Sequence, residues 1–462
     1  MPQFPYPFFP VQFKLDGFLF QQSDLDQLLA GIGAGPKPTD LFVMSHGWNN
    51  DMDDAKDLYS RLSGQIASQI GASASLQGRT FAICGVLWPS KKFDDKDLIP
   101  GGAASLNDSV TDDQVQQRVN DLRDLLAAKG WPMEQSDAGL ESKFSGLVAA
   151  VKEWEDDPDA RRQTVETIRG LLPKDTADAE DASSLFFKLK PDALIGNLER
   201  SVNPPPIAPG SSAASLDPFA LSSGGGLGGA ASFRDVLGGI KGALLHFLNY
   251  TTYYVMKARA GDVGVNGVAP LIQQVRGARP DIRLHLIGHS FGCRVVTSAV
   301  NALPQDEKLC PNTMSLLQGA FSHNGFAANF DGNNNDGAFR AVVKQKKVKG
   351  PIIITHTRND KAVGIAYPIA SRIAGQVAAA LGDENDIYGG LGSNGAQTAE
   401  TTPERVVGTL LSAGSAYPFS SGGTCGHLYN LKADQFISGH SDIVSPAVGY
   451  AIATAMSSPD AA

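Results

Sequence analysis

The sequence predicts an α/β fold: a mostly parallel central sheet flanked by helices, with a helical insertion before the fourth strand. Three observations support this prediction. Short apolar runs alternate with helical patterns on both sides of the chain's centre, as in strand-helix-strand units. Two of these runs, Leu41-Phe42-Val43-Met44 and Ile352-Ile353-Ile354, are continuously apolar, as in strands that are buried on both faces. The third observation is a long block, about 91–239, in which the strand-like runs stop.

Length and composition set the expected organisation. The chain has 462 residues, and a single hydrophobic core stops growing at roughly 250 to 300 residues. We therefore expect either one large domain with an insertion or two domains. The change of pattern places the α/β domain at residues 1–90 and 240–462, and the helical insertion at residues 91–239. An apolar fraction of 42% and a charged fraction of 19% are typical of a soluble globular protein.

The elements of the α/β part follow from apolar runs and helical periodicity. Strands are predicted where apolar side chains form a short run, and helices where they recur every three or four residues. The predicted strands are Val11 to Leu15, Leu41 to Ser45, Thr80 to Leu87, Ile282 to Gly288, Met314 to Phe321, Pro351 to His356 and His427 to Phe436. The predicted helices are Ala55 to Ile70, Val268 to Val275, Cys293 to Ala302, Val363 to Ala380 and Asp442 to Met456.

The insertion is predicted to contain three or four amphipathic helices. Their apolar faces are Val115, Val119, Leu122, Leu125 and Leu126, then Leu140, Phe144, Leu147, Val148, Val151 and Trp154, then Val165, Ile168, Leu171 and Leu172. Residues 201–232 are rich in Pro, Ser and Gly, which is typical of a linker or mobile loop. An aromatic helix, Leu244 to Met256, follows. Its residues Tyr253 and Tyr254 are expected either to pack in the core or to line a substrate cleft.

Charge and cysteine content exclude several classes of protein. The formal charge of −9 and the lack of a clustered basic surface argue against a nucleic-acid partner. The four cysteines lack metal-ligand spacing, so we expect a reducing compartment and no metal. The first residues carry no Lys or Arg before Lys14 and do not resemble a secretory signal, which predicts a cytoplasmic protein unless it is exported without a leader. No run of eighteen apolar residues predicts a transmembrane helix. The pattern does not specify an oligomeric state.

Ser290 stands between two glycines in Gly288-His289-Ser290-Phe291-Gly292, after a predicted strand and before a predicted helix. At this glycine content the pattern G-x-S-x-G arises by chance about 0.4 times per chain, so the context decides. A strand-turn-helix setting is the one in which a sharp turn exposes a serine hydroxyl as a nucleophile. We therefore predict that Ser290 is a nucleophile.

A serine hydroxyl needs a neighbouring base, and eight histidines are present. His440 is preferred because it follows the last predicted strand and precedes the final helix, at the carboxyl ends of the strands. His427 begins that strand and is expected at the opposite edge, where active sites of open α/β folds are not found. His46 and His289 are expected to pack locally or to line the pocket. His323 is expected to line the pocket or to make structural hydrogen bonds.

Two further predictions complete the site. Asp360 follows the strand Pro351 to His356 and supplies a carboxylate for the second nitrogen of the base, with a cap of the next helix as the less favoured alternative. The backbone N–H groups of Trp48 and Phe291 are predicted to form an oxyanion hole, since Trp48 follows a strand that ends in Ser45-His46-Gly47. Asn49 is a further candidate for the pocket lining.

Together, Ser45-His46-Gly47-Trp48, Gly288-His289-Ser290-Phe291-Gly292, Asp360 and His440 resemble the α/β-hydrolase superfamily, in its lipase/esterase-like serine hydrolase branch. The superfamily uses this order of Ser, Asp and His along the chain. The likeness covers about Val11 to Ser90 and Gly264 to Met456. It implies an α/β-hydrolase fold in which the insertion acts as a lid or cap, although many caps of the family come later in the chain.

The predicted activity is cleavage of carboxylic esters by a serine hydrolase through an acyl-enzyme, without a cofactor. The expected substrate is a small-molecule or lipid-like ester. A thioesterase, peptidase or acyltransferase is an alternative, because the same triad and oxyanion hole serve all of them. A non-catalytic α/β-hydrolase scaffold that binds a partner through its insertion is the third interpretation.

Overall fold

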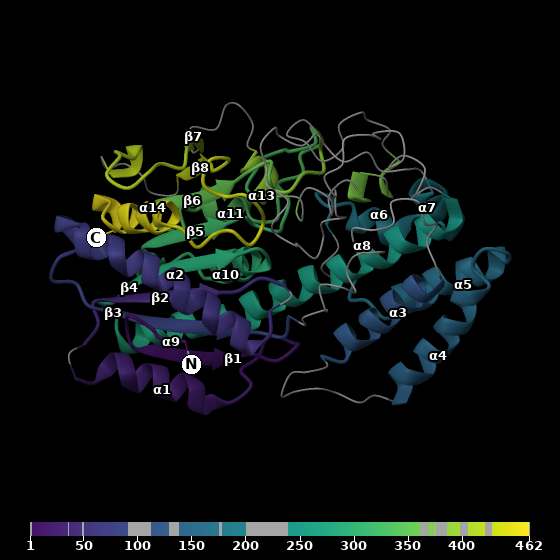
Figure 1. Cartoon of the computed structure of the whole chain (residues 1–462), viewed down its shortest axis with the longest axis horizontal. Helices are drawn as coiled ribbons and strands as arrows, with labels where there is room; N and C mark the ends of the chain where they lie inside the picture. Colours follow the sequence, from purple (N-terminus) through teal and green to yellow (C-terminus); the bar gives the residue numbers. More distant parts are fainter. Residues whose placement is uncertain are drawn as a thin grey trace.

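The computed structural model describes residues 2–35, 37–48, 50–90, 112–128, 138–174, 178–199, 239–360, 363, 369–371, 373–375, 386–397, 405–420 and 427–461. Within these ranges the chain forms one parallel eight-stranded sheet with helices on both faces, and a further group of helices at one end (Figure 1). The predicted α/β architecture with a mostly parallel sheet is therefore confirmed. No helix in these ranges is both long and apolar enough to cross a membrane.

The sheet has the strand order β1-β3-β2-β4-β5-β6-β8-β7, and every neighbouring pair is parallel. Its strands are β1 (Phe8–Gln12), β2 (Asp40–Ser45), β3 (Phe81–Leu87), β4 (Arg283–His289), β5 (Thr313–Leu317), β6 (Ile352–His356), β7 (Arg405–Thr409) and β8 (Leu428–Lys432). The predicted strands overlap all of these except β7. Strand β7 lies at the edge, where Val407 is 69% exposed, so its sequence lacks a continuous buried run. The predicted strands at 314–321 and 427–436 were too long. The first run continues as a buried loop after Leu317, and the second as a partly exposed loop after Lys432.

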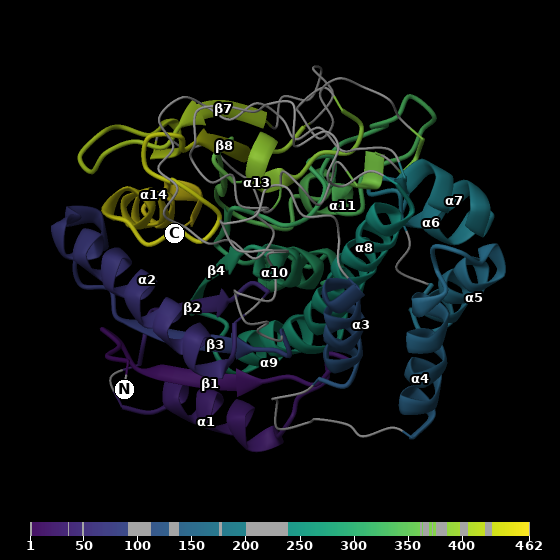
Figure 2. The same ribbon diagram turned by 45° about the vertical axis from the view of Figure 1, so that its right-hand side comes forward.

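Each face of the sheet is covered by its own helices. One face packs against α1 (Gln22–Gly33), α8 (Gly239–Asp262), α9 (Ala269–Ala278) and α10 (Phe291–Ala302), and the other against α2 (Met52–Ala72) and α14 (Pro446–Met456). Figure 2 shows α2 and α14 side by side. Alternation along β2 explains the division, since Leu41 and Val43 enter the first core and Phe42 and Met44 the second.

Some helix boundaries differ from the prediction. Helix α14 begins at Pro446 instead of Asp442, because Ser445 caps it by accepting a hydrogen bond from the Val448 N–H. Helix α1 was not predicted, nor were the short α11 (Arg340–Lys344) and α13 (Leu391–Asn394). Most of the helix predicted at 363–380 and all of the linker at 201–232 lie outside the described residues. The remaining short elements are η1 (Ala74–Leu76), η2 (Val263–Val268), η3 (Glu307–Leu309), η4 (Pro418–Ser420) and η5 (Pro459–Ala461).

The insertion contains more helices than predicted. Its described part holds five: α3 (Asp112–Leu126), α4 (Ala138–Lys152), α5 (Pro158–Arg169), α6 (Ser183–Lys188) and α7 (Pro191–Leu198). The last two are too short for an apolar period to show in the sequence. Buried side chains of these helices belong to the same hydrophobic cluster as one face of the sheet. Arg259 of α8 strengthens this connection, because its guanidinium donates to the carbonyls of Pro89, after β3, and Leu125 of α3.

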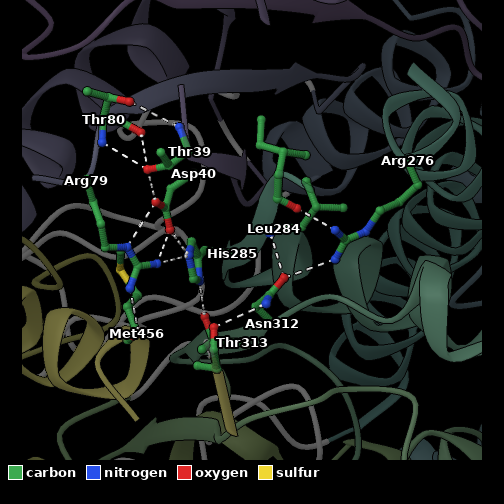
Figure 3. Close-up of polar contacts among 12 residues, drawn as sticks. Thr39, Asp40, Arg79, Thr80, Arg276, Leu284, His285, Asn312, Thr313 and Met456 are labelled. Carbon is green, nitrogen blue, oxygen red and sulfur yellow. Dashed lines mark hydrogen bonds and ion pairs between the residues drawn. The ribbon is translucent and has the colours of Figure 1, made fainter. Parts of the chain in front are cut away.

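A buried polar network joins the amino ends of three neighbouring strands (Figure 3). The Asp40 carboxylate pairs with Arg79 and lies 2.8 Å from His285 Nε2, while His285 Nδ1 lies 2.8 Å from Thr313 Oγ1. Arg79 also donates to the carbonyl of Met456 at the end of α14. Burial alone would raise the pKa of Asp40, but hydrogen bonds from His285 and Arg79 outweigh it and hold that pKa well below its usual range. The network therefore fastens the final helix to the sheet at this edge.

Candidate active site

Ser290 occupies a strained turn between β4 and α10. Its φ of 56° and ψ of −123° lie in a region that residues other than glycine rarely adopt. The flanking glycines make the turn possible. A Cβ atom on Gly288 would lie 2.5 Å from the Cys293 nitrogen, and one on Gly292 would overlap the carbonyl oxygen of Ser45. At both positions the neighbouring backbone therefore leaves no room for a side chain.

The structure brings Ser290, His440 and Asp360 together at the carboxyl edge of the sheet. Ser290 Oγ lies 2.7 Å from His440 Nε2, and His440 Nδ1 lies 2.9 Å from Asp360 Oδ2. Each residue follows a different strand, β4, β8 and β6 respectively. All three are buried. Because a carboxylate only accepts hydrogen bonds, the proton on neutral His440 sits on Nδ1, which leaves Nε2 to accept the Ser290 hydroxyl.

Two further hydrogen bonds from described residues hold the Asp360 carboxylate in place. Gln318 Nε2 donates to Oδ2 at 3.0 Å, and the backbone N–H of Val363 donates to Oδ1 at 3.0 Å. The two interpretations of Asp360 from the sequence are therefore compatible, since one oxygen faces His440 and the other accepts from the backbone three residues later. Gln318 was not predicted. It comes directly after β5, at the same edge of the sheet, whereas the predicted strand at 314–321 had included it.

The loop after β2 approaches the serine closely. A Cβ atom on Gly47 would clash with Ser290 Cβ and lie 3.0 Å from Ser290 Oγ. The Gly47 carbonyl accepts from His46 Nδ1 at 2.9 Å and from the Asn50 side chain at 3.3 Å. In a trans peptide the next N–H points the opposite way, so the Trp48 N–H points away from these donors.

The other predicted oxyanion donor lies at a helix start. Phe291 is the first residue of α10, so its N–H has no acceptor within the helix. The rings of Phe291 and Trp48 pack edge to face, with centroids 6.3 Å apart. The assignment of these two N–H groups to an oxyanion hole stays a prediction.

His46 packs against neighbouring residues, which is one of its two expected roles. Its side chain is fully buried and stacks on Trp88, with ring centroids 5.5 Å apart. Burial lowers the pKa of His46 to about 4. The neutral ring donates from Nδ1 to the Gly47 carbonyl and accepts at Nε2 from the Trp88 N–H. His46 therefore shapes the loop that approaches Ser290.

The other candidates for the pocket lining have different positions. His289 bonds to the backbone carbonyl of His440 and lines a small cavity with Met44, Ser45, Leu58, Tyr59, Leu62 and Ile287. His323 is buried and contacts the Asn394 side chain at 3.2 Å, which is the structural alternative. Tyr253 packs on Phe291, with centroids 5.6 Å apart, whereas the Tyr254 hydroxyl donates to the carbonyl of Pro173 in the insertion. Asn49 lies outside the described residues.

Comparisons of the chain with family models, curated proteins and solved structures found no match.

Proposed function

We propose that the protein is a serine hydrolase that cleaves carboxylic esters through an acyl-enzyme intermediate. The observation that carries this proposal is the continuous chain of hydrogen bonds from Ser290 Oγ through His440 to Asp360. A nucleophile, a base within hydrogen-bond reach and a third group that orients the base are the elements of nucleophilic catalysis. The strained turn that presents Ser290 adds to this support, because such strain concentrates at functional sites.

The geometry allows a balanced sequence of proton transfers. His440 Nε2 takes the Ser290 proton while Oγ attacks the carbonyl carbon, and the carbonyl π electrons move to the oxygen. When this oxyanion collapses, the alkoxide leaves and takes the proton from Nε2, so that an acyl-serine ester remains. Water then attacks the acyl group and gives its proton to Nε2. The second collapse releases the carboxylic acid and returns the proton to Oγ.

The surrounding groups favour the charged states that form during these steps. Asp360 faces the imidazolium that His440 becomes, at a distance of 2.9 Å. The N–H groups of Phe291 and Trp48 are the proposed donors to the oxyanion, and removal of one such donor costs about 3 to 4 kcal/mol in known hydrolases. The packing of Trp48, Phe291 and Tyr253 beside the serine favours an apolar acyl group.

We also place the chain, as part of this proposal, in the α/β-hydrolase superfamily. The serine turn between a strand and a helix supports this, as does the order Ser290, Asp360, His440 along the chain. The insertion between β3 and α8 is then a cap.

A fluorophosphonate probe tests the proposal, because it phosphonylates only activated serines. The wild type and a control variant of an exposed serine, Ser412→Ala, should be labelled, whereas Ser290→Ala should not. Labelling that persists in Ser290→Ala would overturn the assignment of the nucleophile. Rates on matched p-nitrophenyl esters, anilides and thioesters then identify the bond; faster cleavage of anilides or thioesters than of esters would contradict the proposed ester preference.

A further inference from the structure

His289 makes a contact that the proposed reaction does not itself use. It is the last residue of β4 and directly precedes Ser290. Its Nε2 lies 3.0 Å from the backbone carbonyl oxygen of His440, and the two imidazole rings lie 5.1 Å apart at their centroids. The rigid sheet is thereby bonded to the backbone of the residue that contacts Ser290 Oγ.

The chemistry of this contact determines which ring nitrogen of His289 carries the proton. A carbonyl oxygen only accepts hydrogen bonds, so Nε2 must carry the proton. Burial lowers the pKa of His289 to about 3, with a smaller effect from the neighbouring His440. The side chains around the ring are mostly apolar, among them Met44, Leu58 and Ile287. The ring therefore stays neutral, and it does not compete with His440 for the serine proton.

Among the described residues, the loop that carries His440 also has hydrogen bonds within itself. The Asp442 carboxylate accepts from both the N–H and the hydroxyl of Ser438, and the Asp442 N–H donates to the Gly439 carbonyl. Asn359 adds a bond to the Ile437 carbonyl, from the loop after β6. Those bonds shape the loop, whereas the bond from His289 sets the distance between the loop and the end of β4.

We infer that His289 is a positioning residue, which fixes the His440 backbone relative to β4 and so keeps His440 Nε2 within reach of Ser290 Oγ. This inference rests on the proposed function. Misplacement of a reacting group by about 1 Å costs on the order of 100-fold in rate. Loss of the bond should therefore lower kcat by about 10- to 100-fold. KM should change by less than about twofold, since His289 bonds to the His440 backbone and is not among the groups proposed to contact the substrate.

Two amide variants separate this role from general packing. The Nε2 of glutamine can reach the place of the imidazole Nε2, whereas the shorter asparagine cannot. His289→Gln should keep kcat within about threefold of the wild type, and His289→Asn should show the full loss. His289→Leu, which fills the apolar space without a donor, is a second loss variant if His289→Asn does not fold. Equal kcat for the Gln variant and a folded loss variant would overturn the inference.

Backbone hydrogen exchange of residues 438–442 supplies a measurement that does not depend on catalysis. The loss variant should exchange these amides about tenfold faster than the wild type, and His289→Gln should not. If the wild type shows neither labelling nor turnover, the proposed function fails, and the exchange result still decides whether His289 holds the loop. Unchanged exchange in the loss variant would show that it does not.

Discussion

Buried neutral histidines should make the protein sensitive to mild acid. Burial lowers the pKa of His46 to about 4, of His289 to about 3 and of His356 to about 4, from an ordinary value of 6.5. The folded-state pKa is depressed in each case. The stability that these neutral histidines give the folded state is therefore complete above pH 6.5 and is lost as the pH falls toward 4. The reason is that the histidines bind protons in the unfolded chain at a higher pH than in the folded chain. His285, whose pKa burial also lowers, acts in the same direction.

Glu180 opposes this effect. Burial, with a smaller contribution from Asp178, raises the pKa of Glu180 to about 8 from an ordinary 4.5. A raised folded-state pKa gives stabilisation that is complete below pH 4.5 and is lost as the pH rises through 8, so Glu180 stabilises the fold on acidification. Between pH 7.5 and pH 5.0, each of the three histidines lowers the free energy of unfolding by about 2 kcal/mol, whereas Glu180 raises it by about 3 kcal/mol. The net loss in the free energy of unfolding is about 3 kcal/mol.

Urea unfolding at pH 7.5 and 5.0, followed by tryptophan fluorescence, measures this change. The Glu180→Gln variant lacks the opposing group and should lose about 6 kcal/mol over the interval, whereas His289→Gln should lose about 1 kcal/mol. Val407→Thr, at a site that is 69% exposed, keeps every histidine and should behave as the wild type does. Glu180→Gln should therefore lose more stability than the wild type, and His289→Gln less. A wild-type loss below about 1 kcal/mol, or two variants that both lose more or both lose less than the wild type, would refute the assignment of these protonation states.

Three further outcomes follow from the structure. Asp360→Asn should lower kcat by roughly 10³- to 10⁴-fold in steady-state assays, because the amide supports the wrong tautomer of the base; a loss below tenfold would contradict the role of Asp360. Gly47→Ala should lower kcat at least about 100-fold, since its Cβ would clash with Ser290, whereas Gly64→Ala, with open space around the new Cβ, should retain full activity. Asp40→Asn should lower the free energy of unfolding by about 3 to 5 kcal/mol in urea titrations without changing kcat at 25 °C, because its network lies at the amino ends of the strands and the site at their carboxyl ends.

The sequence predicted those features that depend on neighbouring residues. The continuous apolar runs of β2 and β6 indicate burial on both faces of the sheet. The two glycines around Ser290 indicate a turn with no room for side chains. The prediction failed where that signal is weak. Strand β7 lies at the edge and is partly exposed, and α6 and α7 are too short to show a period.

The partners of Ser290 could be predicted from the sequence because of the sheet topology. Parallel strands present their carboxyl ends at one edge of the sheet, so residues that follow β6 and β8 were expected near those that follow β4. Asp360 and His440 are such residues, and their side chains meet as expected although Ser290 and His440 are 150 positions apart.

By itself, then, the sequence determined the α/β architecture, the serine turn and the strand ends at which its partners lie. Only the tertiary structure decided what surrounds them. Gln318 bonds to Asp360, His46 supports the Gly47 loop, and His289 bonds to the His440 backbone. The physical reason is that a strand or a turn reflects the preferences of adjacent residues, whereas a hydrogen bond between distant segments depends on a direction and distance that exist only once the sheet has assembled.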